Sequence, residues 1–158
     1  MTYLILKYVH VIGASVLLGT GAGIAFFMLI GHLTSNAATI AAIARIVVIA
    51  DFVFTATAVV LQPITGIALS WHMGWSLWEG WIALSIVLYI VTGAFWLPVV
   101  WMQMRMRDLA IQSAATGASL PDAYHKLFWI WFAFGFPAFG AVMAIFWLMI
   151  AKPQIAWW

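Results

Sequence analysis

Four long apolar runs dominate the sequence, and each is long enough to cross a lipid bilayer. They cover about residues 3–30, 41–71, 81–104 and 124–151. A spanning helix needs roughly 20 apolar residues, and every run exceeds that length. The composition agrees, because 67% of the residues are hydrophobic and only 6% are charged. Such a chain cannot cover a water-soluble globule with polar side chains, so we expect lipid to surround it.

The predicted fold class is therefore all-α, an integral membrane four-helix bundle that forms a single domain over residues 1–158. The first run starts almost at the initiator Met and is longer than the apolar core of a cleavable signal peptide, so we expect it to remain as a spanning helix. Four spans place both termini on the same side of the membrane. The net charge of +2 comes from scattered basic residues, which excludes a nucleic-acid footprint. The absence of Cys excludes disulfides and thiolate sites.

Basic residues near the helix ends predict the orientation, because cytoplasmic loops carry an excess of Lys and Arg. The side with the first and third loops holds Arg45, Arg105, Arg107 and Lys126, and the side with the termini holds Lys7 and Lys152. We therefore expect a bacterial inner-membrane protein with periplasmic termini. Tryptophan is typical of the membrane interface, and an outer aromatic belt is expected at Trp71, Trp75, Trp78, Trp81, Trp157 and Trp158.

Polar residues inside the second and third runs recur at steps of three and four, which places each set on one helix face. We expect both faces to point inward, since polar side chains in hydrocarbon are costly. Interhelical hydrogen bonding explains most of the Ser and Thr residues. The two sets are Asp51, Thr55, Ala58, Gln62, Thr65, Leu69 and His72, and then Trp81, Ser85, Tyr89, Thr92, Trp96 and Gln103.

The first run carries a ridge of small residues and one intramembrane histidine. Ser15, Gly19 and Gly23 step by four, which predicts close packing against a neighbouring helix. His10 lies about 10 Å from the outer helix start at 1.5 Å per residue, and small residues on its face leave a slot for a flat cofactor. Neutral imidazole is a common ligand of haem iron. The alternative is a packed histidine that is hydrogen-bonded to Gln62 or Tyr89.

Other polar residues extend these hypotheses to both ends of the bundle. His72 ends the second run at the outer level, where it is a candidate second axial ligand or a solvated interfacial residue. At the inner end, Asp51 needs a partner, and an ion pair with Arg45 or Arg105 is expected. An anion clamp formed by Arg105 and Arg107 is the functional alternative.

Several motifs resemble a bacterial membrane family catalogued as domain of unknown function 2269. They are Lys7–His10, Ala50–Thr55, Leu61–Gly66, Phe95–Arg107 and Trp147–Pro153, which together extend over nearly the whole chain. The first run is also distantly similar to that of the four-helix protoporphyrinogen oxidases and the copper-resistance D membrane proteins. In the oxidases the corresponding His is associated with b-type haem. A functional Lys on a later helix of the oxidases has no counterpart here, so the resemblance implies haem binding at His10 without the oxidase activity.

The leading hypothesis is a haem-b membrane protein in which His10 binds the iron and His72 is the candidate second ligand. The other residues expected around the cofactor are Gln62, Tyr89 and Trp96. Electrons would pass to a quinone or another redox partner. The alternatives are a cofactor-free transport or accessory protein with a polar path along Asp51, Gln62, Gln103 and Arg105, or a subunit of a larger membrane complex or homo-oligomer. The enzyme class and substrate are left open.

The orientation predicts the behaviour of topology reporters. A reporter that works only outside the cytoplasm should be active when it is fused after Trp158, and one that works only inside should be active near Thr116. Paired fusions at these two sites measure this directly. The opposite pattern would invert the inner and outer sides.

Overall fold

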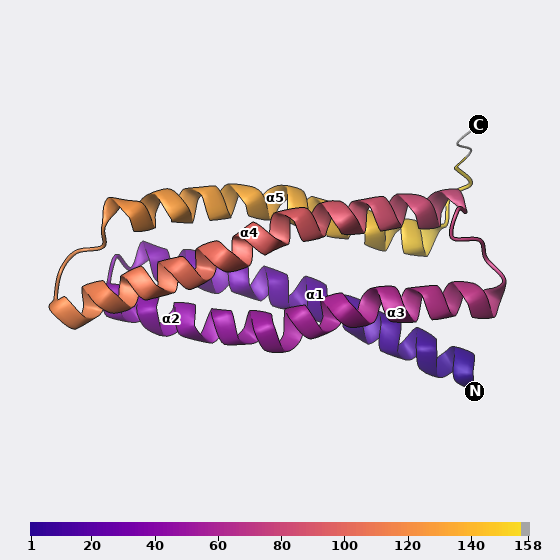
Figure 1. Cartoon of the computed structure of the whole chain (residues 1–158), viewed down its shortest axis with the longest axis horizontal. Coiled ribbons are helices and arrows are strands. Elements are labelled where there is room, and N and C mark those ends of the chain that lie inside the picture. Colours follow the sequence, from indigo (N-terminus) through magenta and orange to yellow (C-terminus); the bar gives the residue numbers. More distant parts are fainter. Residues whose placement is uncertain (156–158) are drawn as a thin grey trace.

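The structure, a computed structural model, describes residues 1–155, and every regular element in that range is helical. The four spans are α1, the continuous α2–η1–α3, α4 and α5. Helix α1 begins and helix α5 ends at the same end of the molecule (Figure 1). The predicted four-helix membrane bundle is thus confirmed. The elements are α1 (Thr2–Leu33), α2 (Ala37–Ala50), the π-helical turn η1 (Asp51–Thr55), α3 (Ala56–Met73), α4 (Gly80–Thr116) and α5 (Asp122–Ala151).

Local sequence signals set the helix ends. The Asn36 side chain accepts a hydrogen bond from the Thr39 amide (2.9 Å) and caps α2. Gly74 and Gly117 follow α3 and α4 with φ of 69° and 66°, a left-handed conformation that glycine adopts at little cost. Helix α4 continues to Thr116, well past the expected end at residue 104. No Gly or Pro interrupts residues 99–116, and its extra turns bury apolar side chains.

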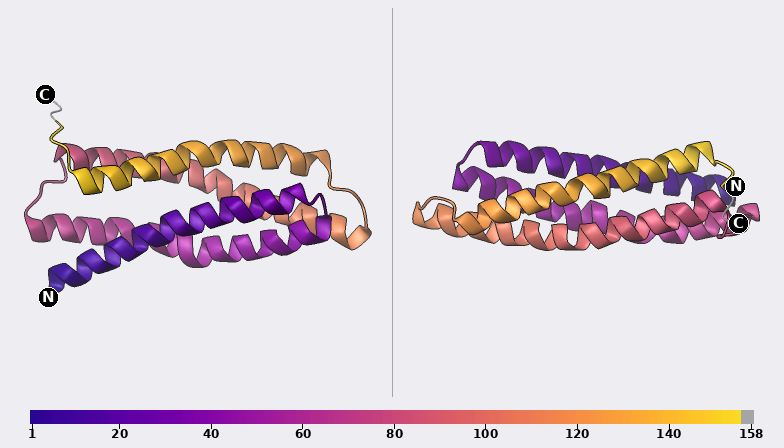
Figure 2. Two further views of the ribbon diagram at one scale, coloured as in Figure 1. Left: turned by 180° about the vertical axis from the view of Figure 1, so that it is seen from behind. Right: turned by 90° about the horizontal axis from the view of Figure 1, so that it is seen from above.

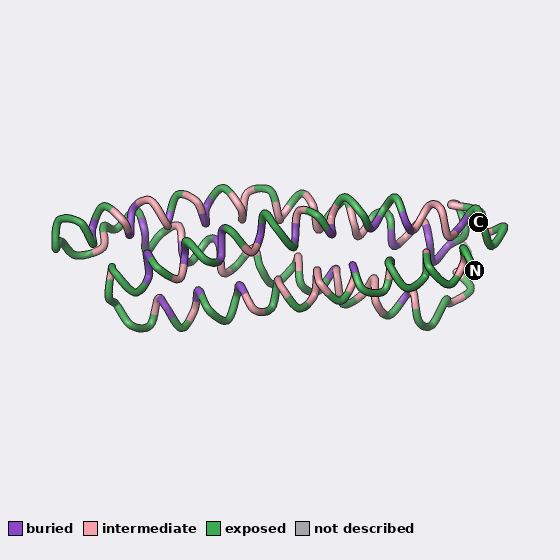
Figure 3. Tube along the Cα trace, turned by 90° about the horizontal axis from the view of Figure 1, so that it is seen from below, coloured by how far each residue is buried: buried purple, intermediate pink, exposed green. Residues whose placement is uncertain are grey.

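The half of the bundle that lies away from the termini, here called the inner half, contains the main hydrophobic core, and the other half is called the outer half. Helix α4 runs obliquely, with its first half beside α5 and its second half also against α2. Side chains from α1, α2, α4 and α5 meet there, and buried and exposed stretches alternate along each helix (Figure 3). The fully enclosed side chains of this core include Met28, Ile40, Met106, Tyr124 and Phe128. This half therefore holds the four spans together.

The outer half is arranged differently, as two separate helix pairs. Helix α3 lies with α1 in one layer, and α4 lies with α5 in the other (Figures 1 and 2). A smaller core of Trp81, Ile82 and Leu148 joins α4 to α5 and the loop before α4. The two layers are thus packed internally more than against each other.

The predicted outer aromatic belt is only partly confirmed. Trp71 and Trp78 are 75% and 79% exposed, as interfacial residues should be. Trp81 is instead buried in the smaller core, where the Lys152 ammonium lies 5.6 Å from its ring centroid and 4.3 Å from that of Trp75. Such cation–π contacts tie the end of α5 to this loop. Trp157 and Trp158 lie outside the described residues.

The predicted ridge on α1 does not pack against another helix of this chain. A Cβ atom added at Gly19 or Gly23 would meet nothing within 4 Å among the described residues, and Ser15 is exposed with its hydroxyl bonded to the Val11 carbonyl. The close approaches of α1 occur at other glycines. At Gly31, for example, an added Cβ would lie 3.0 Å from Ile43 Cδ1 of α2. The repeat of small residues therefore faces away from the bundle.

A tyrosine connects the two layers where a proline breaks the hydrogen-bond ladder of α3. Pro63 has no amide hydrogen, so the carbonyl four residues earlier, on Val59, loses its helical partner. The Tyr89 hydroxyl of α4 donates a hydrogen bond to that carbonyl. In hydrocarbon no water can substitute for the missing donor. Tyr89 therefore provides a donor for the free carbonyl of α3 and links this helix to α4.

This link predicts a specific pairwise coupling. Tyr89→Phe should lower the free energy of unfolding in detergent by about 1 kcal/mol, because the Val59 carbonyl is left without a partner. In a Pro63→Ala background the helix regains its own amide donor, so the same substitution should cost less. A double-mutant cycle on the unfolding free energy measures the difference. Equal losses in both backgrounds would contradict the assignment.

Candidate functional site

The polar faces predicted for the second and third spans do point inward. On η1 and α3, Asp51, Thr55, Gln62 and Thr65 are all buried, whereas His72 at the end of the span is exposed. On α4, Ser85 and Gln103 are buried, and Tyr89, Thr92 and Trp96 are half-buried. Residues 51 and 65 are about 20 Å apart along the helix axis at 1.5 Å per residue. The polar face therefore forms two separate clusters.

His10 is the centre of the outer cluster. Its Nδ1 atom lies 2.8 Å from Thr65 Oγ1, which in turn is 2.8 Å from the Leu61 carbonyl oxygen. The single hydroxyl proton of Thr65 goes to that carbonyl, so we assign the ring proton to His10 Nδ1, which donates to Thr65. Nε2 then carries a free lone pair. Among residues 1–155 it has no hydrogen-bond partner, and it is not enclosed.

Two glycines make room for this cluster between α1 and α3. Gln62 Nε2 donates to the His10 carbonyl oxygen at 2.9 Å. A Cβ atom on Gly13 would lie 2.5 Å from that Gln62 nitrogen, which is too close for any side chain. A Cβ atom on Gly66 would lie 3.3 Å from His10 Cε1. Gly13 thus allows the amide to reach the α1 backbone, and Gly66 leaves space for the imidazole.

The other residues expected around a cofactor do not all lie close to His10. His72 stacks on Tyr3, with ring centroids 6.0 Å apart and an interplanar angle of 10°. It is seven residues beyond Thr65, or about 10 Å along α3, so the structure does not bring His72 and His10 together as a ligand pair. Trp96 belongs to the other cluster, where it bonds to Asp51. Gln62 lies with His10, and Tyr89 reaches the neighbouring turn of α3 at Val59.

Asp51 is the centre of the inner cluster. Its side chain is buried, with 2% of the residue exposed. Trp96 Nε1 donates to Oδ1 at 3.2 Å. With the Gln103 amide oriented to satisfy its neighbours, its nitrogen donates to Asp51 Oδ2 (2.9 Å) and its oxygen accepts from Trp131 Nε1 (3.2 Å). The network joins η1, α4 and α5 through neutral donors.

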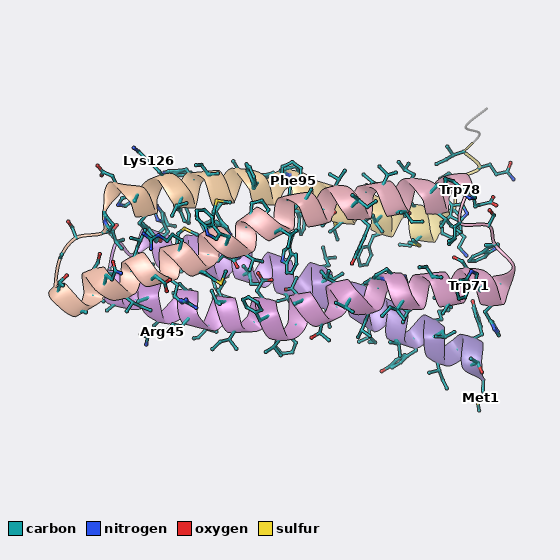
Figure 4. All side chains as sticks on the ribbon, in the orientation of Figure 1. Met1, Arg45, Trp71, Trp78, Phe95 and Lys126 are labelled. Atoms are coloured by element: carbon teal, nitrogen blue, oxygen red, sulfur yellow. The ribbon has the colours of Figure 1, made fainter. Side chains whose placement is uncertain are left out.

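The expected ion pair at Asp51 is wrong. Within the described part of the chain the structure has one salt bridge, between Arg107 and Asp108 (2.8 Å). Arg45 and Arg105 are exposed, and Arg45 and Lys126 lie at the same end of the molecule, opposite Met1 and Trp78 (Figure 4). Their long side chains reach the aqueous side more readily than the buried carboxyl. Arg105 and Arg107 also have different surroundings, so they form no shared anion clamp.

Sequence reasoning missed several residues of these clusters. Trp131 extends the inner network and was not predicted. It follows Phe128 by three residues and Tyr124 by seven, so the spacing alone places all three buried residues on one helix face. The interhelical hydrogen bonding expected of Thr65 is found, but the local sequence does not identify His10 as its partner. His32 follows the expected end of the first run at residue 30, but it lies in α1 and stacks on Phe128, with ring centroids 3.6 Å apart. In residues 1–155 no three His, Asp or Glu side chains gather as a metal cluster.

The comparisons with known proteins identify a family. Residues 4–153 match the family described as "Predicted integral membrane protein (DUF2269)". No curated protein and no solved structure matches the chain significantly. The match covers nearly the whole chain and agrees with the four spans.

The contact at Gly13 predicts a sharp difference between glycines of one helix. Gly13→Ala should lower the unfolding free energy by about 1–2 kcal/mol, because the new methyl group displaces the Gln62 amide from the His10 carbonyl. Gly19→Ala is the matched control and should change it by less than about 0.5 kcal/mol. Thermal or denaturant unfolding in detergent measures both. A loss at Gly13 that persists undiminished in a Gln62→Ala background would refute the proposed clash.

Proposed function

The chain belongs to the DUF2269 family of predicted integral membrane proteins, and from the outer cluster we propose that it binds haem b through His10. The observation that carries the proposal is the state of the imidazole. Thr65 fixes the ring through Nδ1, and Nε2 keeps an unshared lone pair with no protein partner in the described residues. A metal-binding histidine generally has its second nitrogen held in this way.

The surroundings of His10 fit a flat apolar ligand with one protein donor. Gly66 makes room for the imidazole against α3, and the α1–α3 and α4–α5 layers are separate at this level of the bundle. Tyr89 crosses between the layers at Val59 and bounds this region on its inner side. His10 would hold the iron, Thr65 would orient the ring, and Gln62 would keep α1 in place. Haem b, when bound, supplies reversible one-electron transfer.

A redox role in the membrane follows from that chemistry. We place the site in the outer half of a bacterial inner membrane, with periplasmic termini, because the basic residues favour the other side as cytoplasmic. A lipid-soluble quinone is the partner class that can reach an intramembrane site from the bilayer. The protein's own contribution is to orient the imidazole through Thr65.

The geometry gives less support to a cofactor-free polar path. Gln62 donates its amide to the α1 backbone, whereas Asp51 and Gln103 bond to each other about 20 Å away along the helix. Arg105 is exposed and joins neither cluster. Side chains that satisfy one another in separate groups do not line one route. A role as a subunit of a larger complex is compatible with haem binding and is decided by copurification.

The haem proposal predicts the absorption spectrum of the detergent-solubilised protein, produced with haem supplied. Wild type should show a Soret band, and His10→Ala should remove it or weaken it strongly. Thr65→Val should lower haem affinity about 10- to 100-fold, because the Nδ1 partner is lost. Absorbance titration with haem, oxidised and reduced, measures these changes.

Three other histidines serve as controls. His125→Ala, His32→Ala and His72→Ala should retain the band, because these residues lie at the helix ends and outside the outer cluster. A change of spin state with haem retained in His72→Ala would make His72 a second ligand. A colourless wild type would overturn the proposal and favour the transport or subunit alternatives.

A further inference from the structure

The carboxyl group of Asp51 has an unusual environment for a membrane interior. It starts the π-helical turn η1 in the middle of the Ala37–Met73 span and is almost fully enclosed. An ionised carboxylate in such a place is costly unless a cation compensates for it. The surroundings of Asp51 therefore have to provide a positive charge, or the group has to be neutral.

No charged side chain faces Asp51 from the elements around it. Helix α1 has no ionisable residue between His10 and His32, α3 has none before His72, and α5 has none between Lys126 and Lys152. The nearest basic residues on α2 and α4 are Arg45 and Arg105, which are both exposed. Tyr89 on α4 is bonded to Val59. The groups that do contact the carboxyl, Trp96 and Gln103, are uncharged donors.

One buried oxygen beside Asp51 has nothing to bond to. The Thr55 hydroxyl is enclosed and has no hydrogen-bond partner in the described residues. Thr55 is four residues after Asp51, and in the wide π turn residues four apart lie nearly above one another. A hydroxyl can accept as well as donate. The Thr55 hydroxyl is therefore an unused acceptor one helical turn from the Asp51 carboxyl group.

We propose that Asp51 is a proton-binding site in the membrane interior, where its carboxyl group holds a proton at neutral pH and donates it to the Thr55 hydroxyl. The proton comes from the aqueous phase and forms an O–H bond with one carboxylate oxygen, so the charge of the side chain changes from −1 to 0. Trp96 and Gln103 still donate to the carboxyl group in this state. The inference does not depend on haem binding.

A bound metal cation is a poorer solution to the same charge problem. Trp96 and Gln103 direct N–H groups at both carboxylate oxygens, and these positive hydrogens occupy the positions that a cation would take. Hard cations also need several oxygen ligands, whereas Thr55 offers only one here. The π turn supports a functional role, because such turns inside α-helices are frequent at functional sites.

Infrared spectroscopy tests the proposal directly. Protein reconstituted in phosphatidylcholine vesicles at pH 7.5 should show the C=O stretch of a protonated carboxylic acid, and this band should move on transfer to D₂O. Asp51→Asn should lose the band in a matched difference spectrum. Asp108→Asn is the control and should keep it, because Asp108 lies outside the membrane interior in a salt bridge with Arg107. The remaining acidic side chains, Glu79 and Asp122, are exposed.

A second variant covers the case in which Asp51→Asn does not fold. Thr55→Val should keep the band but move it to higher frequency, because the carboxyl O–H loses its acceptor. Replacing potassium chloride with sodium chloride should leave the wild-type band unchanged. The proposal fails if wild type lacks the band, if sodium removes it, or if neither Asp51→Asn nor Thr55→Val alters it.

Discussion

Polar groups inside a bilayer have to find their partners within the protein, because hydrocarbon offers no hydrogen bonds. This constraint explains why the helices meet at a few polar side chains. Tyr89 satisfies the carbonyl that Pro63 leaves free, Gln62 bonds to the α1 backbone, and Gln103 bonds to Asp51. Each contact joins two spans. The hydrogen bonds also fix how far each helix can rotate, which apolar packing alone does less precisely.

The two halves of the bundle are held together by different interactions. The inner half has the larger core, with aromatic side chains such as Phe128 stacked between α1 and α5. The outer half relies on Thr65, Gln62 and Tyr89 to hold separate helix pairs in position. The firmly packed inner half keeps the four spans in register.

The sequence predicts the spans and the direction of their polar faces, because both depend on local periodicity. Asp51, Gln62 and Thr65 are buried as expected. The sequence does not predict which polar groups bond to each other, since those hydrogen bonds join positions far apart in the chain. Asp51 is an example. An arginine is the simplest partner to expect for a buried carboxylate, whereas the structure places the uncharged donors Trp96 and Gln103 against it. The Gly19 and Gly23 repeat misleads for the same reason, since spacing alone does not say which face meets another helix.

The π-helical turn η1 affects how the second span responds to a change in its number of residues. Five residues of a π turn cover roughly the same rotation as four residues of an α-helix, because its hydrogen bonds skip one residue further. Asp51–Thr55 therefore stores one residue more than a plain helix would need. Elsewhere in the span, gaining or losing a residue turns everything beyond it by about 100°. Here the loss of one residue would be absorbed by converting the π turn into α-helix, and α3 would keep its orientation toward α1.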